Sequence, residues 1–277
     1  MTDVMNGERE LLLRAKNIAI QFGGLRAVSD FSLDLYNGEL IGLIGPNGAG
    51  KTTVFNMLSG IYKPTEGAIT FVDRNGNLQM INRKSPAQLN RIGIARTFQN
   101  IRLFGNLSVA DNIKIALHQN RTVNPFDVEF RTLRFRKDEI MMQERTRSLL
   151  SLFHLDTKMQ EYAKNLPYGE QRQLEICRAL ASKPKLLLLD EPAAGMNGQE
   201  TENLMNMISF IRKEFNLTVL LIEHDMKLVM GICERLMVLN YGRIIASGKP
   251  SEIQANPEVI KAYLGSGYDA VKTGGEQ

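Results

Sequence analysis

The sequence predicts an α/β fold built around a mostly parallel sheet, and three observations support this prediction. Segments typical of strands alternate with longer helical patterns along the chain. The segments 39–45, 185–190 and 218–223 are nearly continuous apolar runs, which are typical of strands covered on both faces. With 277 residues, 43% of them hydrophobic, the chain can bury a proper core as one large domain or two small ones.

The N-terminal part predicts a small antiparallel β-subdomain beside this core. The stretches 11–24 (LLLRAKNIAIQFGG), 31–39 (FSLDLYNGE) and 67–73 (GAITFVD) have shorter and more alternating apolar patterns, as is typical of antiparallel strands. We expect the parallel core and the β-subdomain to share residues 11–98 and 166–250, all within one domain that ends near residue 265.

Between about residues 99 and 165 the pattern becomes helical and predicts an inserted helical subdomain. Ser108 precedes a run of helix-compatible residues and can cap a helix. A second long helical pattern, 135–155, follows a loop that contains Pro125. The basic run 121–147 can be a solvated helix face or a nucleic-acid patch, and we favour the solvated face.

The C-terminal part predicts one more helix at about residues 251–265. Asn256 is typical of a helix cap, Pro257 of the first helical position and Gly265 of a helix end. The residues after it are small and polar, so we expect a flexible tail over 266–277.

The composition disfavours several function classes. The net charge of +4 permits an anionic partner without specifying one, and 7% aromatic residues with no tryptophan disfavour broad stacking surfaces for single-stranded nucleic acid. Cys177 and Cys233 lie outside any CxxC pattern, so we expect buried thiols in a reducing compartment. No signal peptide is visible, and no apolar run approaches the ~20 residues of a membrane helix. We therefore expect a cytosolic chain with no nucleic-acid partner.

The segment 45–52, GPNGAGKT, matches the phosphate-binding pattern GxxxxGK[ST]. Its glycines let backbone N–H groups point at phosphate oxygens, and the helix that follows adds its positive end. A buried strand before it and a helix after it favour a phosphate loop over a glycine turn with no ligand. Lys51 is expected to reach the β- and γ-phosphates, and Thr52 to bind Mg²⁺. The expected nucleotide-contacting residues of this loop are Gly45, Pro46, Asn47, Gly48, Ala49, Gly50, Lys51, Thr52 and Thr53.

An acid at the end of a neighbouring apolar strand should form the second half of such a site. The run LLLLDE supplies it, with Asp190 and Glu191 as its last two residues. Asp190 is expected to hold the magnesium shell, and Glu191 to accept a proton from the attacking water or orient it. For Glu191 the alternative is a surface glutamate at a strand end.

Over about residues 11–265 the chain resembles the ATP-binding cassette (ABC) ATPases. RTFQN carries Gln99 at the place of the family's magnesium- and water-contacting glutamine. LPYGEQ precedes LLLLDE, where the family has its LSGGQ signature, and LIEHD places His224 at the histidine that contacts the γ-phosphate. For His224 the alternative is a purely structural histidine. The resemblance implies a P-loop NTPase fold with a RecA-like core, and ATP with Mg²⁺ as its ligands.

The resemblance also implies further nucleotide and dimer contacts. Phe22 stands where the family usually has an adenine-stacking tyrosine, although a core phenylalanine is the alternative. Gly169 keeps a signature backbone N–H that can face nucleotide. The segment AAGMN corresponds to the dimer-contacting D-loop, with Asn197 in place of the usual aspartate.

These cassettes act as head-to-tail dimers, with ATP held between the phosphate loop of one subunit and the signature of the other. The resemblance therefore implies an ATP-hydrolysing subunit of a transporter, on the cytoplasmic side of the inner membrane. The implied partners are a second cassette and two membrane-spanning permease subunits, which would be gripped at about residues 100–111.

Within the family the resemblance is to the ATP-binding proteins of bacterial branched-chain amino-acid importers. The segment DEPAAGMN, the longer linker before the signature and the closing AYLG carry it. It implies an extracellular or periplasmic amino-acid-binding protein as an indirect partner. The open alternatives are cassettes for urea uptake or lipopolysaccharide export, an ATPase acting on nucleic acid or the ribosome, and a regulatory subunit without turnover.

Compared with LSGGQ, the segment LPYGE keeps only Leu166 and Gly169. Pro167 replaces the serine that would bind the γ-phosphate, and it has neither a hydroxyl nor a backbone N–H. Tyr168 and Glu170 replace a glycine and a glutamine. We therefore hypothesise that this segment serves a weaker ATP site, formed with a different cassette in a heterodimer.

Overall fold

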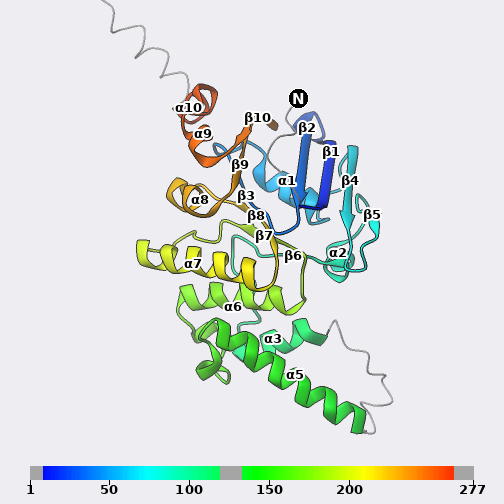
Figure 1. Ribbon diagram of the computed structural model, residues 1–277, viewed down its shortest axis with the longest axis vertical. Coiled ribbons are helices and arrows are strands. Elements are labelled where there is room, and N and C mark those ends of the chain that lie inside the picture. Colours follow the sequence, from blue (N-terminus) through cyan, green and yellow to red (C-terminus); the bar gives the residue numbers. More distant parts are fainter. Residues whose placement is uncertain (1–8, 119–132, 265–277) are drawn as a thin grey trace, which may run out of the picture. The chain divides into compact units, whose positions relative to one another are not determined.

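The structure is a computed structural model that describes residues 9–118 and 133–264 (Figure 1). The chain divides into two compact units. The first unit comprises the chain before Ala95 and after Pro184, and the second spans Ala95–Pro184. The sequence predicts a helical subdomain at about 99–165. The second unit, Ala95–Pro184, begins a few residues earlier and ends about twenty residues later.

The first unit contains two sheets and the helices that cover them. Its strands are β1 (Leu11–Phe22), β2 (Leu25–Tyr36), β3 (Leu40–Ile44), β4 (Glu66–Val72), β5 (Leu78–Met80), β7 (Leu186–Asp190), β8 (Thr218–Ile222), β9 (Arg235–Asn240) and β10 (Arg243–Gly248), and β6 (Ile94–Arg96) begins at its boundary. Its helices are α1 (Lys51–Leu58), α2 (Pro86–Ile92), α7 (Gly198–Glu214), α8 (Met226–Ile232), α9 (Pro250–Gln254) and α10 (Pro257–Leu264).

One sheet is antiparallel and the other is mostly parallel. The first has the order β2-β1-β4-β5, and each pair in it is antiparallel. The second has the order β10-β9-β3-β8-β7-β6, with β3 parallel to both β8 and β9, and β7 parallel to β8. Because parallel strands share a direction, the carboxyl ends of β3, β7 and β8 lie at one edge. The predicted phosphate loop follows β3, and the two predicted acids lie at the end of β7.

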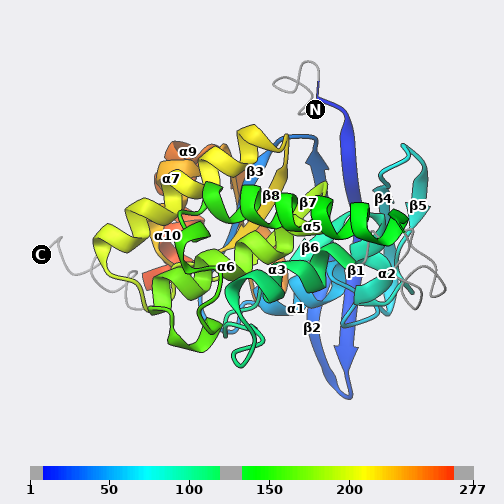
Figure 2. The same cartoon turned by 90° about the horizontal axis from the view of Figure 1, so that it is seen from below.

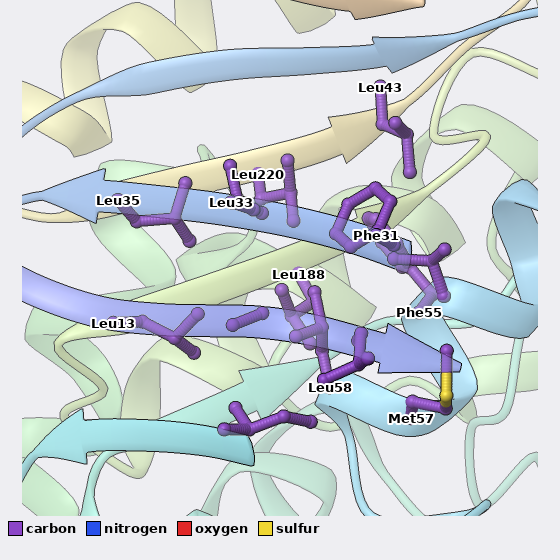
Figure 3. Packing of buried hydrophobic residues seen from close by; sticks show 14 of the residues in the cluster. Leu13, Phe31, Leu33, Leu35, Leu43, Phe55, Met57, Leu58, Leu188 and Leu220 are labelled. Atoms are coloured by element: carbon purple, nitrogen blue, oxygen red, sulfur yellow. The ribbon is translucent and has the colours of Figure 1, made fainter. Parts of the chain in front are cut away.

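The apolar runs predicted to be buried strands are buried on both faces. Every residue of β3, β7 and β8 is buried. On one face, Phe31, Leu33 and Leu35 of β2 pack with Leu188, Leu220 and side chains of α1 in one apolar cluster (Figure 3). Figure 1 shows α7 and α8 on the opposite side of these strands. Burial of a leucine or phenylalanine stabilises the fold by about 1.5–3 kcal/mol.

Helix α7 shows how sequence spacing determines the buried face of a covering helix. Its buried residues Leu204, Ile208 and Ile211 recur every three or four positions, so they lie on one stripe. At its start, Asn197 Oδ1 accepts a hydrogen bond from Glu200 N at 3.0 Å, and Glu200 Oε2 accepts one from Asn197 N at 2.9 Å. This capping box begins the helix right after the segment AAGMN.

The second unit is helical. It contains α3 (Val109–His118), α5 (Leu133–Leu152), α6 (Tyr168–Ala181) and two 3₁₀ turns, Asp156–Lys158 and Ala163–Asn165. The three helices pack on one another, and Figure 2 shows them side by side. The predicted cap is confirmed, because Ser108 Oγ accepts a hydrogen bond from Asp111 N at 3.0 Å. The Pro125 loop and part of the basic run fall outside the described residues.

The two cysteines and the C-terminal helices also bear on the sequence predictions. Cys177 and Cys233 are free and buried, and burial raises the pKa of both thiols. Two short helices, α9 and α10, stand where one C-terminal helix was expected, and Asn256 Oδ1 caps α10 by accepting from Glu258 N at 2.9 Å. The tail 266–277 lies outside the described residues. Among the helices of residues 9–118 and 133–264, none is long and apolar enough to cross a membrane.

Candidate nucleotide-binding site

The phosphate loop joins the buried end of β3 to the start of α1. Gly45 has φ +148°, and a Cβ there would lie 2.0 Å from the Leu239 carbonyl oxygen, so only glycine fits. Gly50 adopts a left-handed conformation (φ 102°) as the N-cap of α1. Asn47, Gly48 and Thr52 are exposed, whereas Ala49 is buried beneath the loop. The loop therefore presents its middle and the first turn of α1 to solvent.

Lys51 is buried at the base of this loop, with 8% of its surface exposed. Its ammonium group donates to the carbonyl oxygens of Gly45 at 2.6 Å and Pro46 at 3.0 Å. Burial lowers the pKa of Lys51, and the negative charge of Glu191 opposes that fall. These two bonds use two of the three donors of the ammonium group, so it can still bind an anion.

The loop is also held by distant segments. Gly242 N, in the turn between β9 and β10, donates to Ala49 O at 2.8 Å. Tyr263, near the end of α10, accepts a hydrogen bond from Gly45 N. Burial raises the pKa of the Tyr263 hydroxyl, and this hydrogen bond opposes the rise. Sequence reasoning did not assign Tyr263 a role, and its position in the closing AYLG was the only available signal.

The acid predicted to hold magnesium, Asp190, and the predicted catalytic acid, Glu191, both lie at the end of β7, and His224 lies after the end of β8. Asp190 is the last residue of β7, with 4% exposed. Glu191 follows it with φ +45°, a conformation that costs a side-chain-bearing residue about 1–3 kcal/mol. Its N–H donates to Ile222 O at 3.0 Å, which ties it to the end of β8. His224 Nδ1 lies 3.9 Å from Glu191 Oε2, so the structure brings these two predicted residues together.

Glu223 is a buried acid that sequence reasoning did not single out. Its side chain is fully buried; Oε1 accepts from Ala193 N at 2.8 Å and Oε2 from His224 N at 3.2 Å. Burial raises the pKa of Glu223, and the backbone N–H groups oppose that rise. It therefore joins the segment after Glu191 to the segment of His224. The sequence did contain a signal for Glu223, because the apolar run TVLLIE ends in this acid.

Phe22 stands at the end of β1 and is not a core side chain. Its exposed fraction is 44%, and its ring packs edge-on against Tyr62 with centroids 5.1 Å apart. An exposed ring of this kind can stack on a planar base.

Gln99 and Gly169 belong to the second unit, whereas Lys51 and Glu191 belong to the first. Gly169 lies in the first turn of α6, where Pro167 is the N-cap residue and makes no side-chain capping bond. Glu170 of this turn is paired with Lys158, whose Nζ lies 2.6 Å from Glu170 Oε2. The charge that distinguishes this segment from LSGGQ is therefore neutralised locally.

The donors expected for magnesium are a hydroxyl, an amide and a carboxylate oxygen, from Thr52, Gln99 and Asp190. Such oxygen donors suit Mg²⁺, which also keeps several waters. Within the described parts of the chain, no group of three or more His, Cys, Asp or Glu side chains is arranged to hold a metal ion.

Two family models match the chain. The model described as "ABC transporter" matches residues 28–194, and one described as "Branched-chain amino acid ATP-binding cassette transporter" matches residues 243–269. The first covers the phosphate loop, the signature segment and both acids. The second covers β10, α9 and α10.

Among curated proteins, LivG of Salmonella typhimurium, a high-affinity branched-chain amino acid transport ATP-binding protein, is 46% identical over 254 residues, which cover 92% of this chain and 98% of LivG. BraF of Pseudomonas aeruginosa, described in the same words, is 42% identical with the same coverage. LptB of Escherichia coli, a lipopolysaccharide export system ATP-binding protein, is 34% identical over 256 residues, which cover 92% of this chain and 98% of LptB.

Solved structures give the same architecture. The ADP conformation of MJ1267, an ATP-binding cassette of an ABC transporter, has a TM-score of 0.78 and 30% identity; the match covers 93% of this chain and all of that one. The cassette cbiO1 of Clostridium perfringens has a TM-score of 0.75 and 25% identity, covering 91% and 94% of the two chains. The P-loop fold predicted from sequence is thereby confirmed.

Proposed function

The chain belongs to the ABC transporter family as one of its ATP-hydrolysing, nucleotide-binding cassettes, and from this premise we propose that it drives an importer of branched-chain amino acids. The observation that carries the substrate class is the match of residues 243–269 to the branched-chain amino-acid cassette model. Identity of 46% with LivG over 92% of this chain supports it further.

The proposed ATP site assigns a role to each candidate residue. Lys51 and the loop N–H groups hold the β- and γ-phosphates, and Phe22 stacks on adenine. Thr52, Gln99 and Asp190 hold magnesium, which neutralises phosphate charge when bound. Glu191 accepts a proton from the attacking water, and His224 contacts the γ-phosphate. The approach of His224 Nδ1 to Glu191 at 3.9 Å supports the last two roles.

Cassettes of this family work with membrane permease subunits. For this chain we propose two permease subunits, a second and different cassette, and a location at the cytoplasmic side of the inner membrane. The signature segment supports the unlike pair. Its N-cap, Pro167, has no N–H to offer a phosphate, and Glu170 is engaged by Lys158. The partner's signature would then complete the stronger site, at Lys51 and Glu191.

Purification through a tagged full-length chain from its native host tests the assembly. We expect a second cassette and two permease subunits to copurify. Reconstituted in liposomes with the matching binding protein, the complex should accumulate radiolabelled leucine only when ATP is present on the cassette side. A complex in which this chain supplies both cassettes, with two equally active sites, would contradict the heterodimer.

The 34% identity with LptB makes lipopolysaccharide export the second candidate function. The same purification separates the two. Copurification of permeases that extract lipopolysaccharide, without ATP-driven uptake of leucine, would replace the import proposal. Uptake of urea in place of leucine would keep the importer and change its substrate.

A further inference from the structure

We propose that Arg172 and Glu175, a buried ion pair on α6, are positioning residues for Gln99. They fix the main chain on both sides of Gln99 to the helix that begins in the signature segment. Gln99 and that helix start are thereby held as one body. This inference rests on the proposed function, because it takes Gln99 to be part of the ATP site.

The pair is fully enclosed in the second unit. The Arg172 side chain is 0% exposed and that of Glu175 is 2% exposed, and Arg172 Nη1 lies 2.8 Å from Glu175 Oε2. Because they stand three positions apart on α6, both point to the same side of the helix. Burying two charges is costly even when they are paired, unless further hydrogen bonds satisfy their remaining atoms. Apart from one bond to the Tyr168 hydroxyl, those further bonds go to one short segment of main chain, and only Arg172 Nε has no partner among the polar atoms of this described pair.

Arg172 binds the two peptide groups that flank Gln99. Its Nη1 donates to Phe98 O and its Nη2 to Gln99 O, both at 2.7 Å. These carbonyls belong to the peptide bonds immediately before and after the Gln99 Cα. A guanidinium is planar and rigid, so its fork fixes both peptide planes together. The backbone angles of Gln99, and therefore the direction in which its side chain leaves the backbone, are fixed with them.

Glu175 binds the same segment by accepting hydrogen bonds from its main-chain N–H groups. Its Oε1 accepts from Arg102 N at 3.2 Å and from Phe98 N at 3.5 Å. The ion pair thus makes main-chain hydrogen bonds at residues 98, 99 and 102, all in the stretch between β6 and α3. This stretch has no helix or strand of its own. The bonds of the ion pair hold its first part, residues 98–102, whereas Asn112 holds Phe104 further along.

The same guanidinium reaches the start of the signature helix. Arg172 Nη2 donates to the Tyr168 hydroxyl at 3.3 Å. Tyr168 is the residue that replaces a glycine of LSGGQ, and this bond gives its hydroxyl a partner. A displacement of the first turn of α6 is therefore transmitted through one side chain to the peptides around Gln99. Turnover should depend on the pair, whereas nucleotide affinity, which rests on the phosphate loop of the first unit, should not.

A purely stabilising role for the pair makes a different prediction. Replacing a buried ion pair by apolar residues of similar volume is often neutral or stabilising. The double variant Arg172→Met/Glu175→Leu should therefore keep the fold while removing the bonds to residues 98–102. Arg172→Lys is the second test variant. It keeps the charge, but an ammonium group cannot reproduce the planar fork that fixes the two peptide planes.

The experiment uses the full chain and four measurements. These are the unfolding temperature, amide hydrogen exchange of residues 98–102, ADP affinity, and ATP turnover together with the copurified transporter subunits. For both variants we expect faster exchange in residues 98–102, ADP affinity within about twofold of wild type, and kcat lowered about 10–100-fold, as misplaced catalytic groups typically cause. Arg14→Met is the control, because it removes an exposed arginine pair with Asp34 (2.7 Å) and should change none of these.

The outcomes separate this proposal from the proposed function. A folded double variant with wild-type kcat would leave the pair a structural role only and overturn the proposal. Unchanged exchange of residues 98–102 in Arg172→Lys would overturn it as well. If wild-type protein shows no turnover with its partners, the proposed function fails, and the exchange data still decide whether the pair holds the Gln99 segment.

Discussion

At the scale of single residues, Lys51 and Glu191, both assigned to the proposed ATP site, are in energetically unfavourable states. Lys51 keeps an ammonium group at a buried position, where two loop carbonyls satisfy it and Glu191 favours its charged form. Glu191 has a positive φ, and a hydrogen bond to the end of β8 holds it there. Strained and buried polar residues of this kind cluster at functional sites, because the surrounding structure must enforce them.

Glu191→Gln tests the catalytic role. The amide keeps the size of the side chain but cannot accept the proton, so we expect kcat to fall by about 10²–10⁴-fold, the range typical of a lost general base. ATP binding should persist, and the closed dimer should accumulate. Turnover assays combined with size-exclusion chromatography in ATP measure both effects. Wild-type turnover in this variant would remove Glu191 from catalysis.

Lys51→Ala tests the phosphate contact. Loss of a charge-assisted bond costs about 1.5–3 kcal/mol, so nucleotide affinity should fall about 10–150-fold. Titration of the full chain with a fluorescent ATP analogue measures it. Lys63→Ala, at an exposed lysine shortly after α1, is the matched control and should bind normally. Equal affinity in the two variants would count against the phosphate loop.

At the scale of elements, the site depends on strands that end together and on helices that begin directly after them. Helix α1 starts at Lys51, and α7 starts at Gly198, shortly after Glu191. The start of each helix is set by the residues at its N-terminus. Gly50, in the left-handed conformation, is the N-cap of α1, and the Asn197–Glu200 capping box begins α7. The asparagine that departs from the usual D-loop aspartate thus has a clear structural role as a helix cap.

Asn197→Ala should destabilise α7. Losing an N-cap costs about 1 kcal/mol, and in a chain of this size that lowers the unfolding temperature by about 2–4 °C. Thermal unfolding followed by circular dichroism measures the change. Gln199→Ala on the same first turn removes an exposed side chain that does not cap the helix, so its unfolding temperature should stay near wild type. Equal shifts in both variants would show that the cap contributes nothing.

At the scale of the whole molecule, the candidate residues are divided between two units. Lys51, Asp190, Glu191 and His224 belong to the first unit, and Gln99 with the signature segment belongs to the second. Within the first, Tyr263 links the C-terminal part that resembles branched-chain amino-acid cassettes to the phosphate loop. The part of the chain that carries the substrate-class resemblance is therefore in direct contact with the predicted phosphate loop, at Gly45.

Acid should destabilise the protein, because three carboxyl groups, the buried Asp73 and the partly exposed Asp111 and Glu234, have lowered pKa values. Backbone N–H groups lower the pKa of Asp73, and the Ser108 hydroxyl lowers that of Asp111. For Glu234, burial raises the pKa, but bonds from Arg9 and Arg212 outweigh it and leave it lowered. A group with a lowered folded pKa stabilises the fold above its unfolded pKa, about 4, and loses that contribution as pH falls through the folded value.

Unfolding temperatures measured from pH 7 to pH 2.5 check this prediction. We expect them to be nearly level down to about pH 4.5 and to fall below it. Glu223 acts in the opposite direction, since its pKa is raised, so its charged form destabilises the fold as pH rises. The triple variant Asp73→Asn/Asp111→Asn/Glu234→Gln should show a shallower acid slope. A slope equal to that of wild type would mean that other groups cause the acid loss.

The parallel strands, the glycine-rich loop after β3 and the two acids at the end of β7 could all be predicted from the sequence. A strand buried on both faces must be apolar throughout, and a loop that wraps a phosphate must place glycine where a Cβ would collide, as Gly45 shows against Leu239. These requirements act on neighbouring residues, so they appear as local patterns. The extra length of the second unit could not be read in this way, because a compact unit is defined by contacts and not by composition.

Tertiary structure alone decided which distant groups satisfy one another. The sequence by itself determined which groups are predicted for the proposed ATP site: the lysine, the acids, the histidine and the altered signature. It did not show that Arg172 binds the peptides around Gln99, some 73 positions away, or that Glu223 joins Ala193 to His224. The physical reason is that buried charges need hydrogen-bond partners, and in these cases most partners are main-chain atoms. Every residue carries such atoms, so no sequence pattern indicates which of them a buried side chain will bind.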